Sequence, residues 1–267
     1  MMIHKTAVVE AGAELGEGVE VGPFAYIEAG AKVGDGSRVG PHATIFGCVE
    51  MGRECRVHSG AVIGDVPQDL SFKGGPSFVR IGDNCTMREG VTIHRGTAEG
   101  SSTVVGDSCF LMAFSHLAHN VVLGDHVIMA NGAVLGGYVE VGERVFISGL
   151  CGAHQFVKIG RLAMMGGASI ATKDVPPFCM LQNAELNTVI GLNVVGMRRS
   201  GMSLEDRKAV QRAFKILFLS GLNATQAKDR IAELFESGPA REFVAFIEAS
   251  TRGLCGCAIQ RNSGLDV

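Results

Sequence analysis

Aliphatic residues recur at every sixth position along most of this chain. The first series runs without interruption from Ile3 to Ile63, and the same spacing returns from Ile81 to Ile93 and from Val105 to Met165. A period of six matches neither the 3.6-residue turn of a helix nor the two-residue alternation of a long strand. It suits short strands that each bury one aliphatic side chain and then bend, so that three of them complete one triangular coil.

Stacked coils of this kind would place each aliphatic residue above another and pair every strand with the coils on either side. Glycine often follows the aliphatic residue, as at Gly16, Gly22 and Gly34, where the chain must turn or pack closely. The 37 glycines and the absence of tryptophan are typical of a protein built from turns and small packing units. The sequence therefore predicts a mainly β protein with the architecture of a parallel β-helix.

Two segments interrupt the repeat. The first runs from Asp65 to Pro76 and contains two prolines and two glycines, and the second, from Arg95 to Thr103, is polar. An insert in a solenoid must leave at a corner as a loop, and loops on a rigid scaffold commonly carry function. We place the β-helix at residues 1–190, with loop inserts near 65–80 and 95–104.

The repeat fades after Pro177, and the remaining sequence changes period. Ser203 and Asp206 predict a capped helix start, and Gly221 predicts the end of that helix. Two further helices are expected, over 225–235 and from Pro239 to about 250. We expect residues 191–267 to form a small helical C-terminal domain.

Composition excludes several classes of function. The net charge of -3 provides no general attraction for nucleic acid, and no stretch is long and apolar enough for a membrane span. The eight cysteines lack C-x-x-C spacing, which suits reduced thiols in the cytoplasm. We expect a soluble cytoplasmic protein in which Cys255 and Cys257 lie in an exposed tail and form neither a redox pair nor a metal site.

Histidines cluster around one part of the repeat. His116 and His119 flank Leu117, and His154 follows two coils later. A histidine near its ordinary pKa can accept a proton from an alcohol, so His119 is our candidate general base. An isolated histidine is more often structural, but clustering favours a site. Zinc binding, as in solenoid carbonic anhydrases, stays open as an alternative, although no third histidine has the expected spacing. We expect no metal and no cofactor, because a nucleotide-binding P-loop motif is also absent.

Six segments carry a more specific signal than the hexads: Pro67–Leu70, Val91–Thr97, His116–His119, Ala153–Phe156, Asp174–Pro177 and Ser250–Gly253. In this order, over essentially the whole chain, they resemble the acyl-carrier-protein-dependent UDP-N-acetylglucosamine O-acyltransferases that open lipid A biosynthesis. The resemblance implies a left-handed β-helix and a homotrimer with active sites between neighbouring chains. It also implies transfer of an R-3-hydroxyacyl chain from acyl carrier protein to the 3-position of UDP-N-acetylglucosamine.

The resemblance also assigns roles to individual residues. His119 matches the general base, and the Gly137 amide would stabilise the oxyanion. Gly167 falls where the family gates the acyl pocket and would leave room for a longer chain. The positions that match substrate contacts are Gln68, Asp69, His116, Tyr138, His154, Gln155, Gly167, Asn193 and Arg199. The basic residues that could dock the acidic carrier protein are Arg198, Arg199, Arg207, Lys208, Arg212 and Lys215.

Five positions depart from the family pattern. Asn120 replaces the usual aspartate after the base, and Tyr138 replaces a frequent histidine. Ser71, Val195 and Ser200 stand where lysine, glutamate and arginine are common. A neutral partner would stabilise the imidazolium less, and loss of a cation could suit an acceptor that carries an amine.

Three alternatives therefore stay open. The acceptor is UDP-N-acetylglucosamine or its 3-amino analogue. The protein could instead be a hexapeptide-repeat enzyme that uses acetyl-CoA on another nucleotide sugar. A structural solenoid without catalysis is the third, because the repeat by itself specifies only a core.

Overall fold

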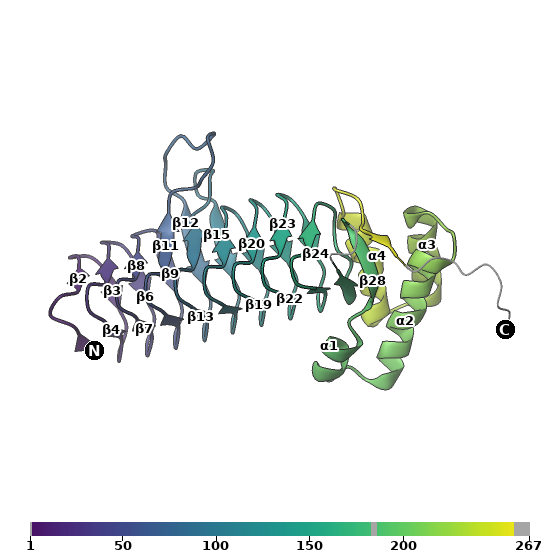
Figure 1. Cartoon of the computed structure of the whole chain (residues 1–267), viewed down its shortest axis with the longest axis horizontal. Coiled ribbons are helices and arrows are strands. Elements are labelled where there is room, and N and C mark those ends of the chain that lie inside the picture. Colours follow the sequence, from purple (N-terminus) through teal and green to yellow (C-terminus); the bar gives the residue numbers. More distant parts are fainter. Residues whose placement is uncertain (1, 183–185, 259–267) are drawn as a thin grey trace.

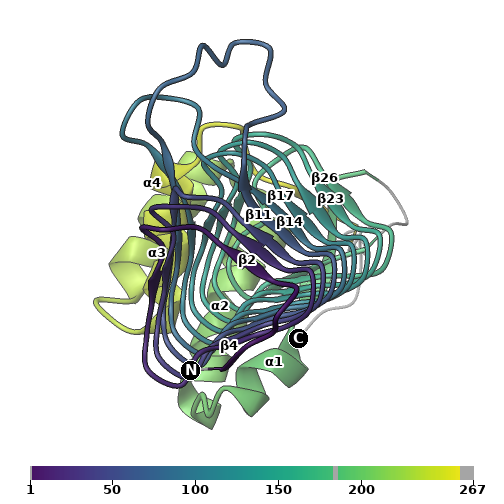
Figure 2. The same ribbon diagram turned by 90° about the vertical axis from the view of Figure 1, so that its left-hand side faces the viewer.

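The computed structural model describes residues 2–182 and 186–258, and it shows a left-handed parallel β-helix capped at one end by helices (Figure 1). Seen end-on, the coils superimpose as a triangle (Figure 2). Each side of the triangle is a sheet of short strands, and from β1 to β26 consecutive strands of the chain belong to consecutive sheets. The predicted fold class is confirmed.

The first sheet contains β1 (Met2–Ile3), β4 (Glu20–Val21), β7 (Arg38–Val39), β10 (Arg56–Val57), β13 (Thr86–Met87), β16 (Phe110–Leu111), β19 (Ile128–Met129), β22 (Phe146–Ile147), β25 (Met164–Met165), β27 (Cys179–Leu181), β28 (Thr188–Leu192) and β29 (Gly256–Cys257). The second contains β2 (Val8–Val9), β5 (Tyr26–Ile27), β8 (Thr44–Ile45), β11 (Val62–Asp65), β14 (Thr92–His94), β17 (His116–Leu117), β20 (Val134–Leu135), β23 (Gly152–Ala153) and β26 (Ile170–Ala171). The third contains β3 (Glu14–Leu15), β6 (Lys32–Val33), β9 (Val49–Met51), β12 (Phe78–Ile81), β15 (Ser102–Val105), β18 (Val122–Leu123), β21 (Glu140–Val141) and β24 (Lys158–Ile159). Corner 1 joins the first sheet to the second, corner 2 the second to the third, and corner 3 the third to the first.

Strand register keeps the hexads in phase through both inserts. Paired residues are 18 positions apart in regular coils, as for Val21 and Val39. The separation grows to 30 between Val57 and Met87 and to 24 between Met87 and Leu111. All three separations are multiples of six, so an aliphatic residue still stacks on an aliphatic residue. The core is a continuous column of buried side chains.

Both inserts leave the β-helix at corner 2. Loop 1, residues 66–77, connects β11 to β12, and loop 2, residues 95–101, connects β14 to β15. The loops project beyond the triangular outline (Figure 2). Because they belong to neighbouring coils, they lie over the same stretch of corner 2.

Corner 3 is closed by a ladder of aspartates. The Asp83 carboxylate accepts a hydrogen bond from the Arg53 backbone amide, and the Asp107 carboxylate accepts one from the Asp83 amide, both at 2.8 Å. A Cβ on Gly52 or Gly82 would collide with the aspartate of the next coil. This explains why a glycine stands directly before the residue whose amide is bonded, as Gly52 does before Arg53 and Gly82 before Asp83.

The helical end comprises α1 (Val194–Arg199), α2 (Leu204–Leu219), α3 (Ala224–Leu234), a 3₁₀ turn η1 (Pro239–Arg241) and α4 (Glu242–Ala249). The Ser203 side chain caps α2 by accepting a hydrogen bond from the Asp206 amide, as the sequence predicts. A complete reciprocal capping box forms instead at α3, between Asn223 and Gln226. Helix α1 was not predicted, because six residues are too few for a periodic pattern.

The chain after α4 returns to the β-helix. The side chain of Asp174 is fully buried and accepts hydrogen bonds from the Lys158 amide (2.8 Å) and the Ser250 hydroxyl (2.6 Å). β29 then pairs with β28, and Cys255 is 1% exposed. The expectation of an exposed tail is therefore wrong for Cys255, because strand pairing draws this segment against the last coils. β28 crosses position 190, where the sequence places a domain boundary.

Among the helices in the described ranges, none combines the length and the apolar character that a membrane crossing requires.

Candidate active site

His119 lies at corner 2, two residues after β17, and is only 8% exposed. Its Nδ1 atom is 3.1 Å from Oδ1 of Asn120, which occupies the left-handed region at φ +60°. The Thr97 backbone amide donates to the same Oδ1 atom at 3.0 Å. A backbone amide can only donate, so this end of the Asn120 side chain is its oxygen, and Nδ1 of His119 must carry a hydrogen. Nε2 is left with its lone pair free to accept a proton.

Asp69 from loop 1 faces this second nitrogen. Its Oδ2 atom is 3.5 Å from Nε2 of His119, a separation that leaves no good hydrogen bond between them. Hydrogen bonds from Ser71, the backbone amide first, lower the pKa of the Asp69 carboxyl below its usual range. Asp69 is therefore an ionised group next to the candidate base.

Gly137 occupies the position equivalent to His119 on the next coil. A Cβ at Gly137 would overlap the His119 imidazole, so only glycine leaves room for the ring. Within the described ranges, the Gly137 amide donates to no other group, although the equivalent amides of Ala29 and Gly47 bond to Glu10 and Glu28. Gly137 thus presents a free N–H beside the imidazole.

A hydrogen-bonded chain extends from Asn120 away from the imidazole. Oγ1 of Thr97 donates to Oδ1 of Asn120 at 2.9 Å and lies 2.8 Å from the Tyr138 hydroxyl. The Tyr138 ring stacks on Phe156, with centroids 4.9 Å apart, and meets the His119 ring edge-on. The structure therefore links loop 2 to three successive coils around the candidate base.

His116 points outward from the second sheet. Its Nδ1 atom lies 2.7 Å from Oγ1 of Thr92, and its ring meets that of His94 edge-on. Burial, followed by the nearby His94 and His119, lowers the pKa of His116 to about 4. Burial also lowers the pKa of His94, which the sequence analysis did not single out. Its place in the Ile93–Thr97 motif was the available signal, because loop 2 begins there and packs over the same corner.

The other predicted residues are more dispersed. Gln68 is exposed on loop 1. His154 and Gln155 are exposed at corner 2, on the coil that follows Gly137. Gly167 lies at corner 1, where an added Cβ would have one neighbour within 4 Å, the Gly149 carbonyl at 3.9 Å. A side chain could therefore occupy this space without displacing the chain.

Asn193 and Arg199 line a different surface. They border a cavity of about 900 Å³ between the outer face of the first sheet and α1, together with Phe110, Phe146 and Met164. Asn193 caps α1 by accepting from the Gly196 amide and donates to the Leu162 carbonyl, both at 2.9 Å, whereas Arg199 is exposed. Within one chain, these two residues lie at the two ends of α1, beside the first sheet, whereas the His119 cluster lies at corner 2.

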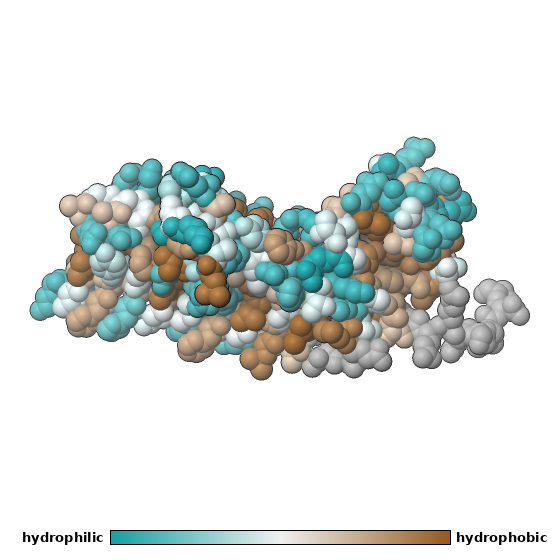
Figure 3. All heavy atoms as spheres, turned by 90° about the horizontal axis from the view of Figure 1, so that it is seen from above, coloured by the Kyte–Doolittle hydropathy of each residue, from teal (hydrophilic) through white to brown (hydrophobic). Residues whose placement is uncertain are grey.

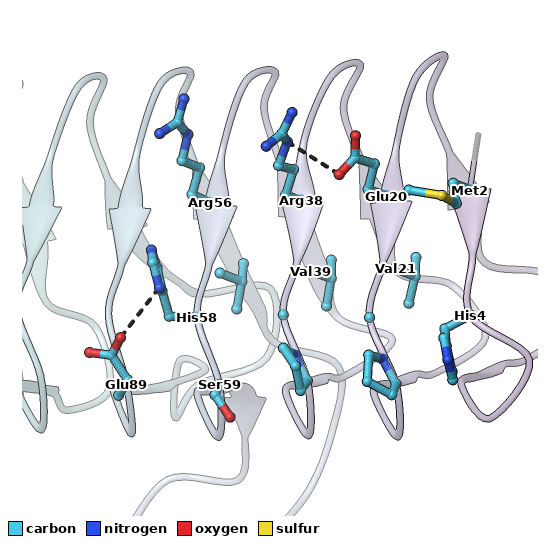
Figure 4. A pocket seen from close by; sticks show the side chains of 15 residues that line it. Met2, His4, Glu20, Val21, Arg38, Val39, Arg56, His58, Ser59 and Glu89 are labelled. Carbon is cyan, nitrogen blue, oxygen red and sulfur yellow. Dashed lines mark ion pairs between the residues drawn. The ribbon is translucent and has the colours of Figure 1, made fainter.

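A second hollow of about 590 Å³ lies on the first sheet near the N-terminus (Figure 4). Two ion pairs cross it, Arg38 with Glu20 and His58 with Glu89, each at 3.4 Å. It contains none of the predicted site residues. The described residues hold no group of three or more His, Cys, Asp or Glu side chains placed to bind a metal ion.

A β-helix with this histidine at its corner defines a hexapeptide-repeat transferase, and comparisons with known proteins agree. The bacterial transferase hexapeptide model matches residues 12–47 and 102–137, and the model for domain 2 of UDP N-acetylglucosamine O-acyltransferase matches residues 174–255. The acyl-[acyl-carrier-protein]–UDP-N-acetylglucosamine O-acyltransferase of Burkholderia orbicola is 43% identical over 94% of this chain and 98% of its own length. That of an Anaeromyxobacter species is 44% identical over 95% and 99%.

Solved structures give the same result. The UDP-N-acetylglucosamine O-acyltransferase of Moraxella catarrhalis superimposes with a TM-score of 0.92 at 34% identity, covering 96% of this chain and 100% of that one. The chain belongs to the acyl-[acyl-carrier-protein]–UDP-N-acetylglucosamine O-acyltransferase family, a family of acyltransferases.

Proposed function

We propose that this protein transfers an R-3-hydroxyacyl chain from acyl carrier protein to the 3-position of UDP-N-acetylglucosamine, the first step of lipid A biosynthesis. The names of its relatives support the donor and the acceptor. The observation that carries the proposal is the setting of His119, whose Nδ1 is held by Asn120 while Nε2 makes no short hydrogen bond and lies near Asp69 and Gly137.

In this mechanism Nε2 of His119 takes the proton of the sugar 3-hydroxyl while that oxygen attacks the thioester carbonyl. The carbonyl oxygen becomes an oxyanion, which the free Gly137 N–H stabilises. The carbon–sulfur bond then breaks, and the imidazolium returns its proton to the departing thiolate. No metal or cofactor takes part. General base catalysis of this kind typically contributes about 10²- to 10⁴-fold in rate.

The 3-amino analogue is a second candidate acceptor, and Asn120 favours it. A neutral amide stabilises the imidazolium that forms during transfer less than a carboxylate would. An amine is a stronger nucleophile than a hydroxyl and needs less help from a base. Asp69, ionised and 3.5 Å from Nε2, would also attract an ammonium group.

We further propose a homotrimer in which each site is completed by two chains. The separation of His119 from Asn193 and Arg199 on one chain supports this arrangement. Apolar side chains gather along one long edge of the β-helix (Figure 3). At corner 1, Phe114 and Leu150 are 71% and 73% exposed. Association would bury these side chains, a favourable contribution.

Other features fit the same reaction. Arg198 and Arg199 end α1, and Lys208, Arg212 and Lys215 are exposed on α2, so this surface could attract the acidic carrier protein. Open space at Gly167 would admit a longer acyl chain, which Gly167→Met should shorten. All eight cysteines are free, which favours a cytoplasmic location.

The primary experiment assays the purified protein with R-3-hydroxyacyl carrier proteins of several lengths and both acceptors. Ester or amide formation that His119→Ala abolishes supports the proposal. A protein that acylates neither acceptor, or that prefers acetyl-CoA, contradicts it.

Mixed oligomers test the sharing of sites. His119→Ala and Arg199→Ala subunits, each inactive alone, are refolded together. If one site uses His119 of one chain and Arg199 of its neighbour, about a quarter of the sites in a random mixture are intact. A mixture as inactive as its components would show that one chain supplies both residues. Tyr26→Phe, which changes a distant side chain, replaces one component as the control.

A further inference from the structure

We propose that Thr97 and Tyr138 are positioning residues that lock the Asn120 amide with its oxygen toward His119. The inference rests on the function proposed above, in which His119 is the base. A carboxylate accepts hydrogen bonds at both ends, but an amide accepts at one end and donates at the other. With the NH₂ group turned toward Nδ1, His119 would have to carry its hydrogen on Nε2. The lone pair that receives the acceptor proton would then be lost.

The hydrogens around Asn120 can be assigned without ambiguity. Oδ1 only accepts, so the Thr97 amide, the Thr97 hydroxyl and His119 Nδ1 all donate to it. The Thr97 hydroxyl hydrogen is thereby used, and the contact at 2.8 Å requires Tyr138 to donate to Thr97 Oγ1. Rotating the amide would place its NH₂ group against the Thr97 backbone amide, which can only donate, and would force the Thr97 hydroxyl to turn round and accept. The network therefore favours one orientation.

The lock is needed because Asp69 acts in the opposite direction. Its carboxylate lies 3.5 Å from Nε2 of His119 and attracts a proton to that nitrogen. Only the acceptor at Nδ1 opposes this attraction. A neutral oxygen does so more weakly than a carboxylate, so its orientation must be held firmly.

Rigid surroundings hold the lock in place. The Tyr138 ring is stacked on Phe156 with 10° between the planes, so its hydroxyl has little freedom to turn away. The Asn120 backbone amide donates to the buried Thr103 hydroxyl at 2.8 Å. Thr97 joins from loop 2, 23 residues before Asn120, and Tyr138 from the next coil.

The first experiment reads the tautomer directly. Nitrogen-15 NMR of histidine-labelled full-length protein distinguishes a hydrogen on Nδ1 from one on Nε2. We expect Nδ1–H for His119 in the wild type and a partial shift toward Nε2–H in Thr97→Val, which loses the hydroxyl donor but keeps the backbone amide that donates to Asn120. An unchanged tautomer in Thr97→Val, or Nε2–H in the wild type, would overturn the lock. This readout needs no turnover, so it stands or falls separately from the proposed reaction.

The second experiment is a double-mutant comparison of kinetics. Thr97→Val should lower kcat about 10-fold and Tyr138→Phe about 3-fold, with KM for the sugar nucleotide unchanged. In an Asn120→Asp background both losses should shrink below about 2-fold, because a carboxylate has no wrong orientation. Equal losses in both backgrounds would contradict the lock. Tyr26→Phe, which removes the hydroxyl bonded to Glu10, is the matched control.

Discussion

Corner 2 and corner 3 have the same backbone but different uses. Asn84 and Ser108 at corner 3, like Asn120 and Tyr138 at corner 2, have φ between 56° and 61°. At corner 3 four amides of this kind are bonded to an aspartate of the next coil or of the coil after an insert, at Glu17, Arg53, Asp83 and Asp107. At corner 2 the Gly137 amide has no such partner in the described ranges, and an imidazole lies beside it. The repeat supplies identical turns, and the candidate site differs from them in having an imidazole beside an amide without a carboxylate partner.

The strongest test of this comparison is His119→Ala. We expect kcat to fall by about 10²- to 10⁴-fold, because the proton acceptor is lost. The melting temperature should fall only modestly by comparison, although the ring that is removed is just 8% exposed. Acyl-transfer kinetics and thermal unfolding on the same preparation measure both. Full activity would remove corner 2 from the mechanism.

Gly137→Ala should produce the next largest effect. The added methyl group would overlap the His119 ring and displace it, and we expect a loss of about 10²-fold in kcat/KM. Gly149→Ala is a suitable control, because the nearest atom to its new Cβ is the Asn131 carbonyl oxygen at 3.4 Å. If both variants behave alike, the close packing of Gly137 on His119 has no catalytic role.

At corner 3, Asp107→Ala should lower stability but leave activity unchanged. The Asp83 amide would lose its acceptor, and the free energy of unfolding should fall by about 1 kcal/mol because water can partly replace the bond. Denaturant unfolding measures this change. Activity per folded molecule should be unchanged, and a selective loss of kcat would mean that corner 3 is not purely structural.

The last expected effect is a pH dependence of stability. The folded-state pKa of His116 is lowered to about 4, so the unfolded chain binds a proton that the folded chain excludes. Stability attributable to this group is therefore present above the unfolded pKa of about 6.5 and is lost as pH falls toward about 4. Unfolding free energies measured across this range should decline less steeply in His116→Asn. An identical slope would show that His116 is not held neutral.

The two corners also differ in how well the sequence predicted them. The hexads, and the glycines that follow them at corner 3 such as Gly16 and Gly34, recur in step along the chain, so one coil explains the next. His119 was proposed as the base because it clusters with His116 in one hexad. Its link to Thr97 and Tyr138 was not found, because these two residues are 41 positions apart and belong to no common motif.

The helical end shows the same difference between features with a local sequence signal and contacts between distant residues. Ser203 and Pro239 marked helix starts through local chemistry. The docking of Ser250 on Asp174 joins residues 76 positions apart, and no local signal indicates that the tail returns to the β-helix. The same reason explains the wrong expectation for Cys255.

By itself, the sequence determined the β-helix, the three predicted helices and the identity of the candidate base, because periodicity and capping act between near neighbours in the chain. Only the tertiary structure decided that loop 2, Asn120 and Tyr138 share one hydrogen-bonded network. It also placed Asn193 and Arg199 on a different surface from His119. These outcomes depend on loop closure and coil stacking, which bring distant residues together with orientations that no spacing encodes.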